Sequence, residues 1–300
     1  MGPVVIFTDL DGTLLDSNTY SFEGALPALN LLKERGIPLV LSSSKTRTEV
    51  EHYRRLLDNH DPFIVENGGA VFIPKGYFPF PISELDSPPR RTDDFYEILE
   101  LGVPYPSLVQ ALRDIREELD LDLKGFSDME KEEVVALSGL SMAEATMALQ
   151  REWGEPFRAD LSPIDMERLE KAVLDRGLRL TVGDRFYHLT GANDKGQAVK
   201  ALIRIYQSAS GGEIKSVALG DSLNDLPMLQ AVDIPILLPK SEGGFDLSVI
   251  SSIWSISSIS SVSSSGNRMI LAKEAGPRGW NRAILLEIES GDRDREKERR

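Results

Sequence analysis

Two carboxylates stand two positions apart at the end of a short apolar run near the N-terminus. The run Val4 to Phe7 is β-branched and aromatic, which is typical of a buried strand, and it leads through Thr8 into Asp9-Leu10-Asp11-Gly12. Side chains two apart on a strand share a face, and Gly12 permits a sharp turn there. Two carboxylates in one crevice repel each other unless a cation lies between them. The pair therefore predicts a Mg²⁺ site with oxygen ligands, and the alternative is an acidic strand-to-loop junction.

A second acidic cluster follows another short run of the buried type. Residues 216–219 lead into Gly220-Asp221-Ser222-Leu223-Asn224-Asp225, in which Asp221 comes directly after the expected strand. Asn224 and Asp225 begin an expected helix. Strand ends that are remote in the chain can meet at one edge of a parallel sheet, so we expect both acidic clusters to converge.

A hydroxyl group and an ammonium group have matching positions at the ends of other expected elements. The strand candidate 37–41 ends in Ser42-Ser43-Ser44, where a hydroxyl could cap the next helix or help to hold an anion. Lys195 opens the expected helix 197–206. Because the helix dipole disfavours a cation in the first turn, a nearby anion explains Lys195 better than solvation does. We predict that Lys195 clamps a phosphoryl group and a carboxylate.

These residues need a scaffold, and strand and helix patterns alternate from Val4 to about Pro81. Short loops between alternating elements predict an α/β fold with a mostly parallel sheet flanked by helices. The segment 83–189 interrupts this order with an α+β pattern that is large enough for its own core. We expect a core of residues 1–82 and 190–290, an inserted domain of residues 83–189, and a disordered charged tail at 291–300.

Charge and composition narrow the possible partners. A net charge of −14 over 300 residues argues against nucleic acid or an anionic membrane as partner. An anionic substrate would then need local cations, namely a metal with Lys45, Arg47 and Lys195. The absence of cysteine excludes disulfides and thiol catalysis, and three histidines make a His-rich zinc site unexpected. With neither a signal peptide nor a long apolar run in the sequence, we expect a cytoplasmic location.

The two acidic motifs, D-x-D-G-T and G-D-x-x-N-D, resemble those of the haloacid dehalogenase superfamily of phosphohydrolases in type and order. The resemblance implies a Rossmann-like core in which 83–189 forms a cap that closes over the site, excludes water and reads the leaving group. It implies a Mg²⁺-dependent reaction through an aspartyl-phosphate. The resemblance implies that Asp9 is the nucleophile and a metal ligand, and that Asp11 is the general acid and base, with its backbone carbonyl on the metal. It implies that Asp221 is a further metal ligand and that Asp225 supports a metal-bound water. Contacts with the phosphoryl oxygens are implied for Ser43, Asn224 and Lys195.

Four further segments resemble one family within that superfamily, the mannosyl-3-phosphoglycerate phosphatases, over about residues 4 to 287. They are S-S-K-T-R-T-E at 43–49, E-N-G-G-A at 66–70, R-E-W-G-E-P-F at 151–157 and G-P-R-G-W-N at 276–281. The resemblance implies a phosphorylated sugar-glycerate as substrate and the compatible solute mannosylglycerate as product, with the glucosyl analogue accepted by some members. The substrate contacts that we expect are Ser44, Lys45, Arg47, Asn67, Gly68, Arg151, His188 and Asn224.

Several of these positions have structural alternatives. Arg47 could be a solvated helix residue, Trp153 could fill the core of the cap, and His188 could simply be packed or exposed. Trp280 could anchor the last helix. The Ser-rich stretch 248–265 interrupts the family pattern before Lys273 and receives no role.

Three other activities fit the same residues. The chain could hydrolyse another sugar phosphate, or it could be a sugar phosphomutase of the same superfamily, which would need a bisphosphate activator. A non-catalytic sugar-phosphate sensor is a third alternative, although a sensor has no need of Asp11.

Overall fold

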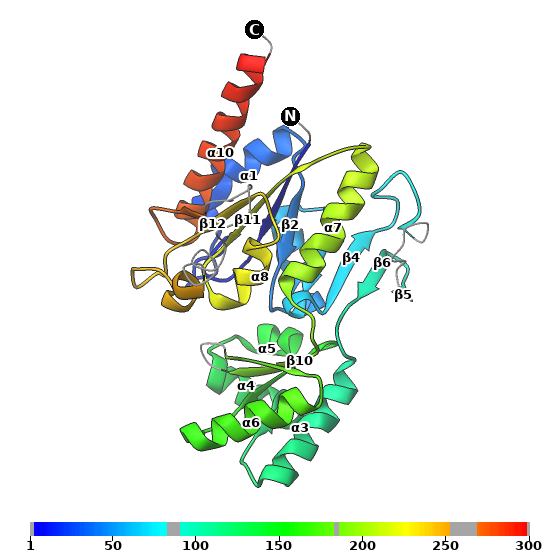
Figure 1. The fold of residues 1–300 in the computed structure, drawn as a ribbon, viewed down its shortest axis with the longest axis vertical. Helices are drawn as coiled ribbons and strands as arrows, with labels where there is room; N and C mark the ends of the chain where they lie inside the picture. The colour runs from blue at the N-terminus through cyan, green and yellow to red at the C-terminus, as the bar shows by residue number, and fades with distance from the viewer. Residues whose placement is uncertain (1–2, 83–90, 183–185, 253–268, 299–300) are drawn as a thin grey trace, which may run out of the picture. The chain divides into compact units, whose positions relative to one another are not determined.

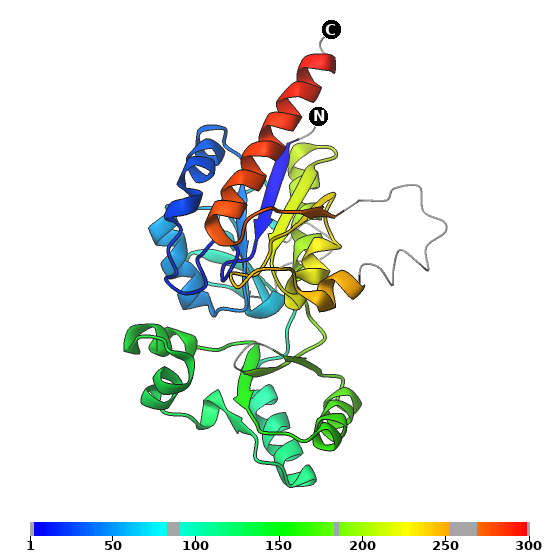
Figure 2. The ribbon, with the colours of Figure 1, turned by 90° about the vertical axis from the view of Figure 1, so that its left-hand side faces the viewer.

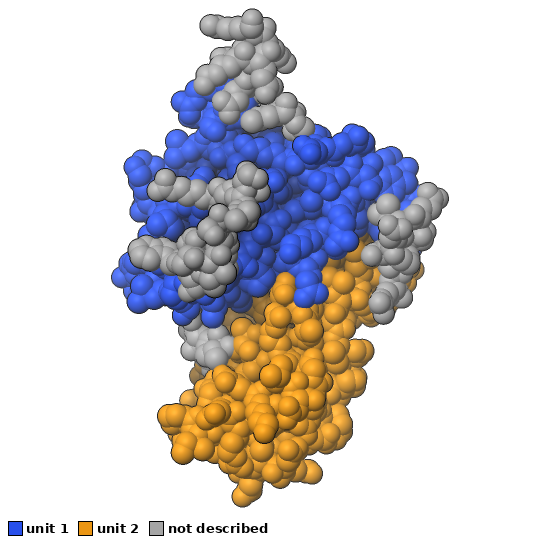
Figure 3. All heavy atoms as spheres, in the orientation of Figure 1, with its two compact units in different colours: residues 1–43, 75–88, 195–300 blue, residues 44–74, 89–194 orange. Residues whose placement is uncertain are grey.

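The computed structural model describes residues 3–82, 91–182, 186–252 and 269–298. The chain divides into two compact units, shown in different colours in Figure 3. Unit 1 comprises Met1–Ser43, Lys75–Pro88 and Lys195–Arg300, and unit 2 comprises Ser44–Pro74 and Pro89–Asp194. These boundaries differ from the expected ones, because Ser44–Pro74 fall into the same compact unit as most of the inserted segment.

Unit 1 contains a parallel sheet in the order β13-β12-β11-β1-β2. Each neighbouring pair is parallel, as the alternating pattern predicted. In the register of the two central strands, Thr8 lies opposite Leu219, so β1 and β11 end at the same edge of the sheet. The strands are β1 Val4–Thr8, β2 Leu39–Ser42, β11 Lys215–Gly220, β12 Ile234–Leu237 and β13 Ile270–Leu271.

Helices cover both faces of this sheet (Figures 1 and 2). On one face α1, Leu26–Glu34, packs against α10, Gly276–Glu298, and on the other α7, Lys195–Ser210, packs against α8, Leu226–Leu229. The short 3-10 helices η1 and η5 span Glu23–Ala25 and Leu223–Asp225. Side chains of the central strands are fully buried between these layers, which confirms the predicted α/β fold class.

The C-terminal segment differs from the expected disordered tail. Helix α10 continues to Glu298, and its Asp292 forms an ion pair with Arg35 Nη1 at 2.7 Å. Near the start of the same helix, Trp280 is completely buried and its Nε1 donates a hydrogen bond to Thr8 Oγ1 at 3.0 Å. Trp280 is thus the anchor that the structural alternative described. Of the Ser-rich stretch, residues 248–252 are helical and the remainder lies outside the described residues.

Unit 2 contains four strands in the order β3-β4-β6-β5, and the adjacent strands are antiparallel. Strand β6 pairs with β4 along its whole length, from Ala70 opposite Glu100 to Pro74 opposite Tyr96. The predicted domain boundary at residue 83 therefore separates strands that belong to one sheet. The elements are β3 Phe63–Val65, β4 Ala70–Pro74, β5 Arg91–Thr92, β6 Tyr96–Glu100, the helix α2 Arg47–Leu57 and the 3-10 helix η2 Glu66–Gly68.

A second, antiparallel sheet of unit 2 has the order β7-β8-β10-β9. Helices α3 and α6 pack on it through an apolar cluster around Leu112, Phe157 and Leu169. A smaller cluster around Phe126 and Val134 joins α4 and α5. The elements are β7 Lys124–Gly125, β8 Gly154–Arg158, β9 Arg179–Val182, β10 Tyr187–Thr190, α3 Tyr105–Leu119, η4 Phe126–Asp128, α4 Lys131–Ser138, α5 Met142–Ala148 and α6 Pro163–Asp175.

Among the described residues, the protein has no helix that combines the length and the apolar character needed to cross a membrane.

Candidate active site

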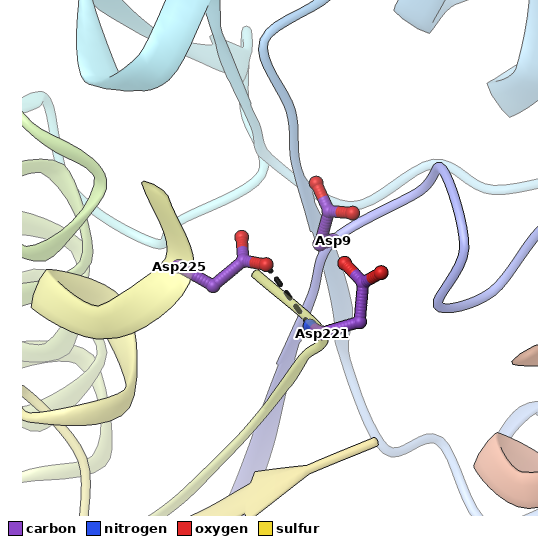
Figure 4. Close-up of side chains that lie close together, drawn as sticks. All are labelled: Asp9, Asp221 and Asp225. Carbon is purple, nitrogen blue, oxygen red and sulfur yellow. Dashed lines mark hydrogen bonds between the residues drawn. The ribbon is translucent and has the colours of Figure 1, made fainter. Parts of the chain in front are cut away.

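Three carboxylates converge where the central parallel strands of unit 1 end. Asp9 follows β1, Asp221 follows β11, and Asp225 ends η5. All three are buried, and one oxygen of each lies within 4.8 Å of the others. Figure 4 shows these side chains turned toward one another. The convergence of Asp9 with Asp221, predicted from two strand ends remote in sequence, is thus present in the structure.

Glycines make this close approach possible. Gly12 has a φ of +74°, and a Cβ at this position would lie 2.6 Å from Asp221 Oδ2. A Cβ at Gly220 would lie 2.5 Å from the Cβ of Asp225. Any larger residue at either position would push a carboxylate out of the cluster, so the glycines of both motifs are steric requirements of the site.

Lys195, the first residue of α7, lies between two of the carboxylates. Its completely buried Nζ donates to Asp9 Oδ1 at 2.6 Å and to Asp225 Oδ1 at 2.7 Å. Burial alone would lower the pKa of Lys195, but the charges of Asp225 and Asp9 raise it above its ordinary value. Lys195 is therefore held in the charged form at its helix N-terminus, beside anions as predicted.

Asp9 carries an opposing perturbation. Burial and the charge of Asp225 raise the pKa of Asp9 well above its usual range, although Lys195 acts in the other direction. Positive charge beyond that of Lys195 would thus favour the ionised form of Asp9. The acidic cluster favours a further cation because the negative charge of its carboxylates exceeds the positive charge of the ammonium groups that contact them.

Asp225 holds the loop that carries Asp221. Its Oδ2 accepts hydrogen bonds from the backbone N–H groups of Asp221 at 3.0 Å and Ser222 at 3.1 Å, and from Ser222 Oγ at 3.0 Å. The other oxygen, Oδ1, accepts from Lys195. Both oxygens of Asp225 are therefore engaged within the protein, and the nearby Asn224 accepts a hydrogen bond from Ser222 Oγ.

Sequence reasoning missed Lys240, whose Nζ lies 3.0 Å from Asp221 Oδ2. Lys240 follows β12, the parallel neighbour of β11, so the argument from strand ends that located Asp221 could have found it too. Burial and the charge of Asp225 raise the pKa of Asp221 to about 6, and Lys240 limits this rise. Asp221 thus shares the excess negative charge of the cluster.

The donor set fits a divalent cation of the Mg²⁺ type. Hard cations prefer oxygen ligands, and Asp9 and Asp221 present carboxylate oxygens at one sheet edge with Asp225 beside them. Their raised pKa values show that the protein leaves negative charge only partly compensated. Asp11 lies near enough for its charge to raise the pKa of Asp9 further, but its carboxylate is not part of the converging triad.

The hydroxyl-rich segment after β2 divides into residues with different surroundings. Ser43 is completely buried at the end of the strand. Thr46 supplies the capping hydroxyl of α2, because its side chain accepts from Glu49 N and the Glu49 carboxylate accepts from Thr46 N. The capping alternative for Ser43 is therefore wrong. Lys45 is buried, with its Nζ 3.9 Å from a Glu49 oxygen and 5.7 Å from the centre of the Tyr53 ring.

Arg47 is not the solvated helix residue of the structural alternative. Its guanidinium pairs with Glu51 at 2.9 Å and Asp93 at 2.8 Å, and it lies over the rings of Phe72 and Tyr96. These contacts fix the side chain within unit 2, where its substrate contact stays a prediction.

The turn Glu66-Asn67-Gly68 has three consecutive residues with positive φ, at 47°, 54° and 85°. Backbone strain of this kind persists only where surrounding contacts impose it. Here the completely buried Glu66 carboxylate accepts from the N–H groups of Glu152 at 2.8 Å and Trp153 at 3.1 Å. The turn and the segment after α5 are therefore joined by hydrogen bonds within unit 2, which the sequence did not reveal.

The side chain of Arg151 also contacts this turn. Its Nε lies 3.2 Å from Glu66 Oε2, and its Nη2 donates to the backbone oxygen of Ser44 at 3.2 Å. Trp153 is buried against Gly69 and Phe72, which lie outside residues 83–189, and not in the core of the cap as the alternative for this residue held. His188 is partly buried, and desolvation with the charge of Arg151 lowers its pKa to about 3, so its imidazole is neutral at physiological pH. Substrate contacts by Ser44, Asn67, Gly68, Arg151 and His188 stay predictions.

Comparison with known proteins identifies the class of this chain. The model of the haloacid dehalogenase-like hydrolases matches residues 6–100. Among solved structures, one from Thermoplasma acidophilum has a TM-score of 0.61 at 18% identity and covers 95% of this chain and 98% of its own. A HAD subclass IIB sugar phosphatase has a TM-score of 0.59 at 14% identity, with 94% and 98% coverage. These similarities establish the fold.

Curated relatives establish the family. A glucosyl-3-phosphoglycerate/mannosyl-3-phosphoglycerate phosphatase of Methanococcoides burtonii is 42% identical over 281 residues, covering 94% of this chain and 96% of the relative. A mannosyl-3-phosphoglycerate phosphatase of Pyrococcus furiosus is 38% identical over 234 residues, covering 78% and 90%. The chain therefore belongs to the mannosyl-3-phosphoglycerate phosphatase family of haloacid dehalogenase-like hydrolases, which are phosphoric monoester hydrolases. The resemblance drawn from the sequence motifs is confirmed.

Proposed function

We propose that the protein is a Mg²⁺-dependent phosphatase that hydrolyses mannosyl-3-phosphoglycerate, or its glucosyl analogue, to the sugar-glycerate and phosphate. The observation that carries this proposal is the 42% identity with a phosphatase of this double specificity over 94% of the chain. The buried cluster of Asp9, Asp221 and Lys195 supports it, because it offers a nucleophile, a cation site and a phosphate-binding ammonium at one sheet edge.

Asp9 acts as the nucleophile in this proposal. One carboxylate oxygen attacks phosphorus, the bond between phosphorus and the glycerate oxygen breaks, and Asp11 protonates the departing alcohol. Water then attacks the aspartyl-phosphate while Asp11 removes its proton, which releases phosphate and restores Asp9. The nucleophile has to be ionised, and the contact with Lys195 at 2.6 Å favours that form against the burial that raises its pKa.

Other residues of the chain bind and orient the phosphoryl group. Lys195, Ser43 and Asn224 surround its equatorial oxygens, where negative charge is concentrated during transfer. Asp225 keeps Lys195 and the backbone of Asp221 in place through hydrogen bonds to both of its oxygens. Mg²⁺, when bound by Asp9, the Asp11 carbonyl and Asp221, supplies charge neutralisation for the phosphoryl oxygens.

The inserted segment determines which leaving group is accepted in this proposal. Residues 83–189 act as a cap, and two contacts with the glycerate carboxylate and the sugar come from this segment, Arg151 and His188. The other contacts come from residues that precede it, namely Ser44, Lys45, Arg47, Asn67 and Gly68. The substrate is a small anion, and neither nucleic acid nor a membrane is a partner of a chain with this charge. We place the reaction in the cytoplasm.

A panel of phosphorylated sugars and sugar-glycerates, ranked by kcat/KM with Mg²⁺ and with a chelator, tests the proposal. We expect the mannosyl and glucosyl 3-phosphoglycerates to rank first and the chelator to abolish phosphate release. Asp9→Asn should keep the thermal unfolding profile and lose turnover by several orders of magnitude. Isomer formation without phosphate release would indicate a phosphomutase, and normal turnover by Asp9→Asn would end the nucleophile assignment.

A further inference from the structure

The acidic cluster is contacted by two ammonium groups in very different surroundings. Lys195 is completely buried and bridges Asp9 and Asp225. Lys240 retains 23% exposure of its side chain and reaches Asp221 Oδ2 at 3.0 Å. The backbone of Lys240 is fixed by a tight turn, since its N–H donates to Gly244 O at 2.8 Å and its carbonyl accepts from Gly243 N at 2.9 Å. Its flexible stem thus starts from an anchored point.

This difference in burial gives the two lysines different freedom. Removing Lys195 from its site would leave two buried carboxylates without their shared cation, which is a large cost. The Lys240 ammonium can exchange its carboxylate contact for water, because its side chain already reaches solvent. A divalent cation bound by Asp221 would bring like charge beside this ammonium and compete for the same carboxylate.

We propose that Lys240 is a positioning residue that covers Asp221 in the metal-free protein and is displaced when the divalent cation binds. The ammonium neutralises part of the repulsion among the converging carboxylates while the cation is absent. The same contact weakens cation binding, because the ion pair between Lys240 and Asp221 has to be broken or weakened whenever a cation binds to Asp221. This inference rests on the proposed cation site.

Mg²⁺ titration by calorimetry, without substrate, tests the proposal on Lys240→Met and Lys240→Arg. Loss of the ammonium should tighten Mg²⁺ binding about three- to fivefold, within the range expected for one partly exposed charge pair, and the arginine variant should stay within about twofold of the unaltered protein. Lys215→Met is the matched control. Lys215 pairs with Glu287 at 2.6 Å with 21% side-chain exposure, at the opposite end of the same strand β11, and should leave Mg²⁺ affinity unchanged.

Chemical labelling gives a second readout that reports displacement itself. Acylation of Lys240 by an amine-reactive ester, followed by peptide mass spectrometry, should increase at least about twofold when Mg²⁺ replaces a chelator, since a free amine is more accessible than one held by a carboxylate. Labelling of Lys215 should not change. Equal Mg²⁺ affinity in Lys240→Met, or unchanged labelling of Lys240, would overturn the proposal while leaving the cation site intact. Absence of Mg²⁺ binding by the unaltered protein would overturn the cation site, and the role of Lys240 with it.

Discussion

Replacement of Gly12 by alanine separates backbone strain from displacement of a carboxylate. Gly12 has a φ of +74°, where an L-residue costs about 1–2 kcal/mol, and its new Cβ would lie 2.6 Å from Asp221 Oδ2. Atoms do not approach a Cβ so closely, so the Asp221 carboxylate has to withdraw by several tenths of an ångström. Gly36→Ala is the matched control, because Gly36 has a φ of +60° and a Cβ added there would meet nothing within 4 Å.

Both variants should lose similar stability, about 1–2 kcal/mol, which corresponds to a decrease in Tm of about 2–8 °C. Only Gly12→Ala should lose function. Because misplacement of a catalytic group by about 1 Å can reduce rates about a hundredfold, we expect kcat/KM to fall about ten- to a hundredfold, with weaker Mg²⁺ binding in calorimetry. Gly36→Ala should stay within about twofold. If Gly12→Ala kept normal kcat/KM and Mg²⁺ affinity, the position of Asp221 would not matter and the reasoning would be refuted.

Three other perturbations test the buried charges. Lys195→Met should destabilise the metal-free protein by about 3–5 kcal/mol and abolish phosphatase activity, and denaturant unfolding should show partial recovery in the double variant with Asp225→Asn; equal stability of the unaltered protein and Lys195→Met would contradict this. The neutral His188 takes up a proton only near pH 3 in the folded protein but near pH 6.5 in the unfolded chain, so the free energy of unfolding falls as pH drops through this window. His188→Gln should reduce the loss of unfolding free energy between pH 6.5 and pH 4 by about 2–3 kcal/mol. An unchanged dependence of stability on pH in this variant would contradict the burial of a neutral His188. Glu66→Gln should cost about 3 kcal/mol in urea unfolding because a buried ion pair is broken, whereas Glu152→Gln, which breaks an exposed pair with Arg91, should cost less than about 1 kcal/mol.

The sequence predicted those parts of the site that depend on strand ends and short motifs. Asp9 and Asp221 could be placed together because parallel strands end at one edge, and Lys195 because an unpaired cation is unfavourable at a helix N-terminus. Most helices and strands also follow from their hydrophobic periodicity, which reports burial on one face directly.

Contacts that depend on long-range packing could not be predicted in this way. The buried carboxylate of Glu66 reads as a polar turn residue, and nothing local indicates that it accepts hydrogen bonds from residues more than eighty positions away. The pairing of β6 with β4 has the same origin, since a strand pattern does not name its partner and the expected domain boundary fell between the two strands. The tail was expected to be disordered from its charges alone, yet the ion pair of Asp292 with Arg35 links α10 to a residue far earlier in the chain.

The arrangement of charge explains why the cluster needs both a fixed and an exchangeable cation. Lys195 has to stay, because it neutralises Asp9, the proposed nucleophile, together with Asp225, and its ammonium is completely buried. A second permanent, buried ammonium on Asp221 would satisfy the remaining carboxylate so well that a metal could gain little by binding. Lys240 contacts Asp221 from a partly exposed position, so it reduces repulsion without removing the raised pKa of Asp221. The partial compensation of Asp221 is therefore the feature that would let a divalent cation bind and still be released.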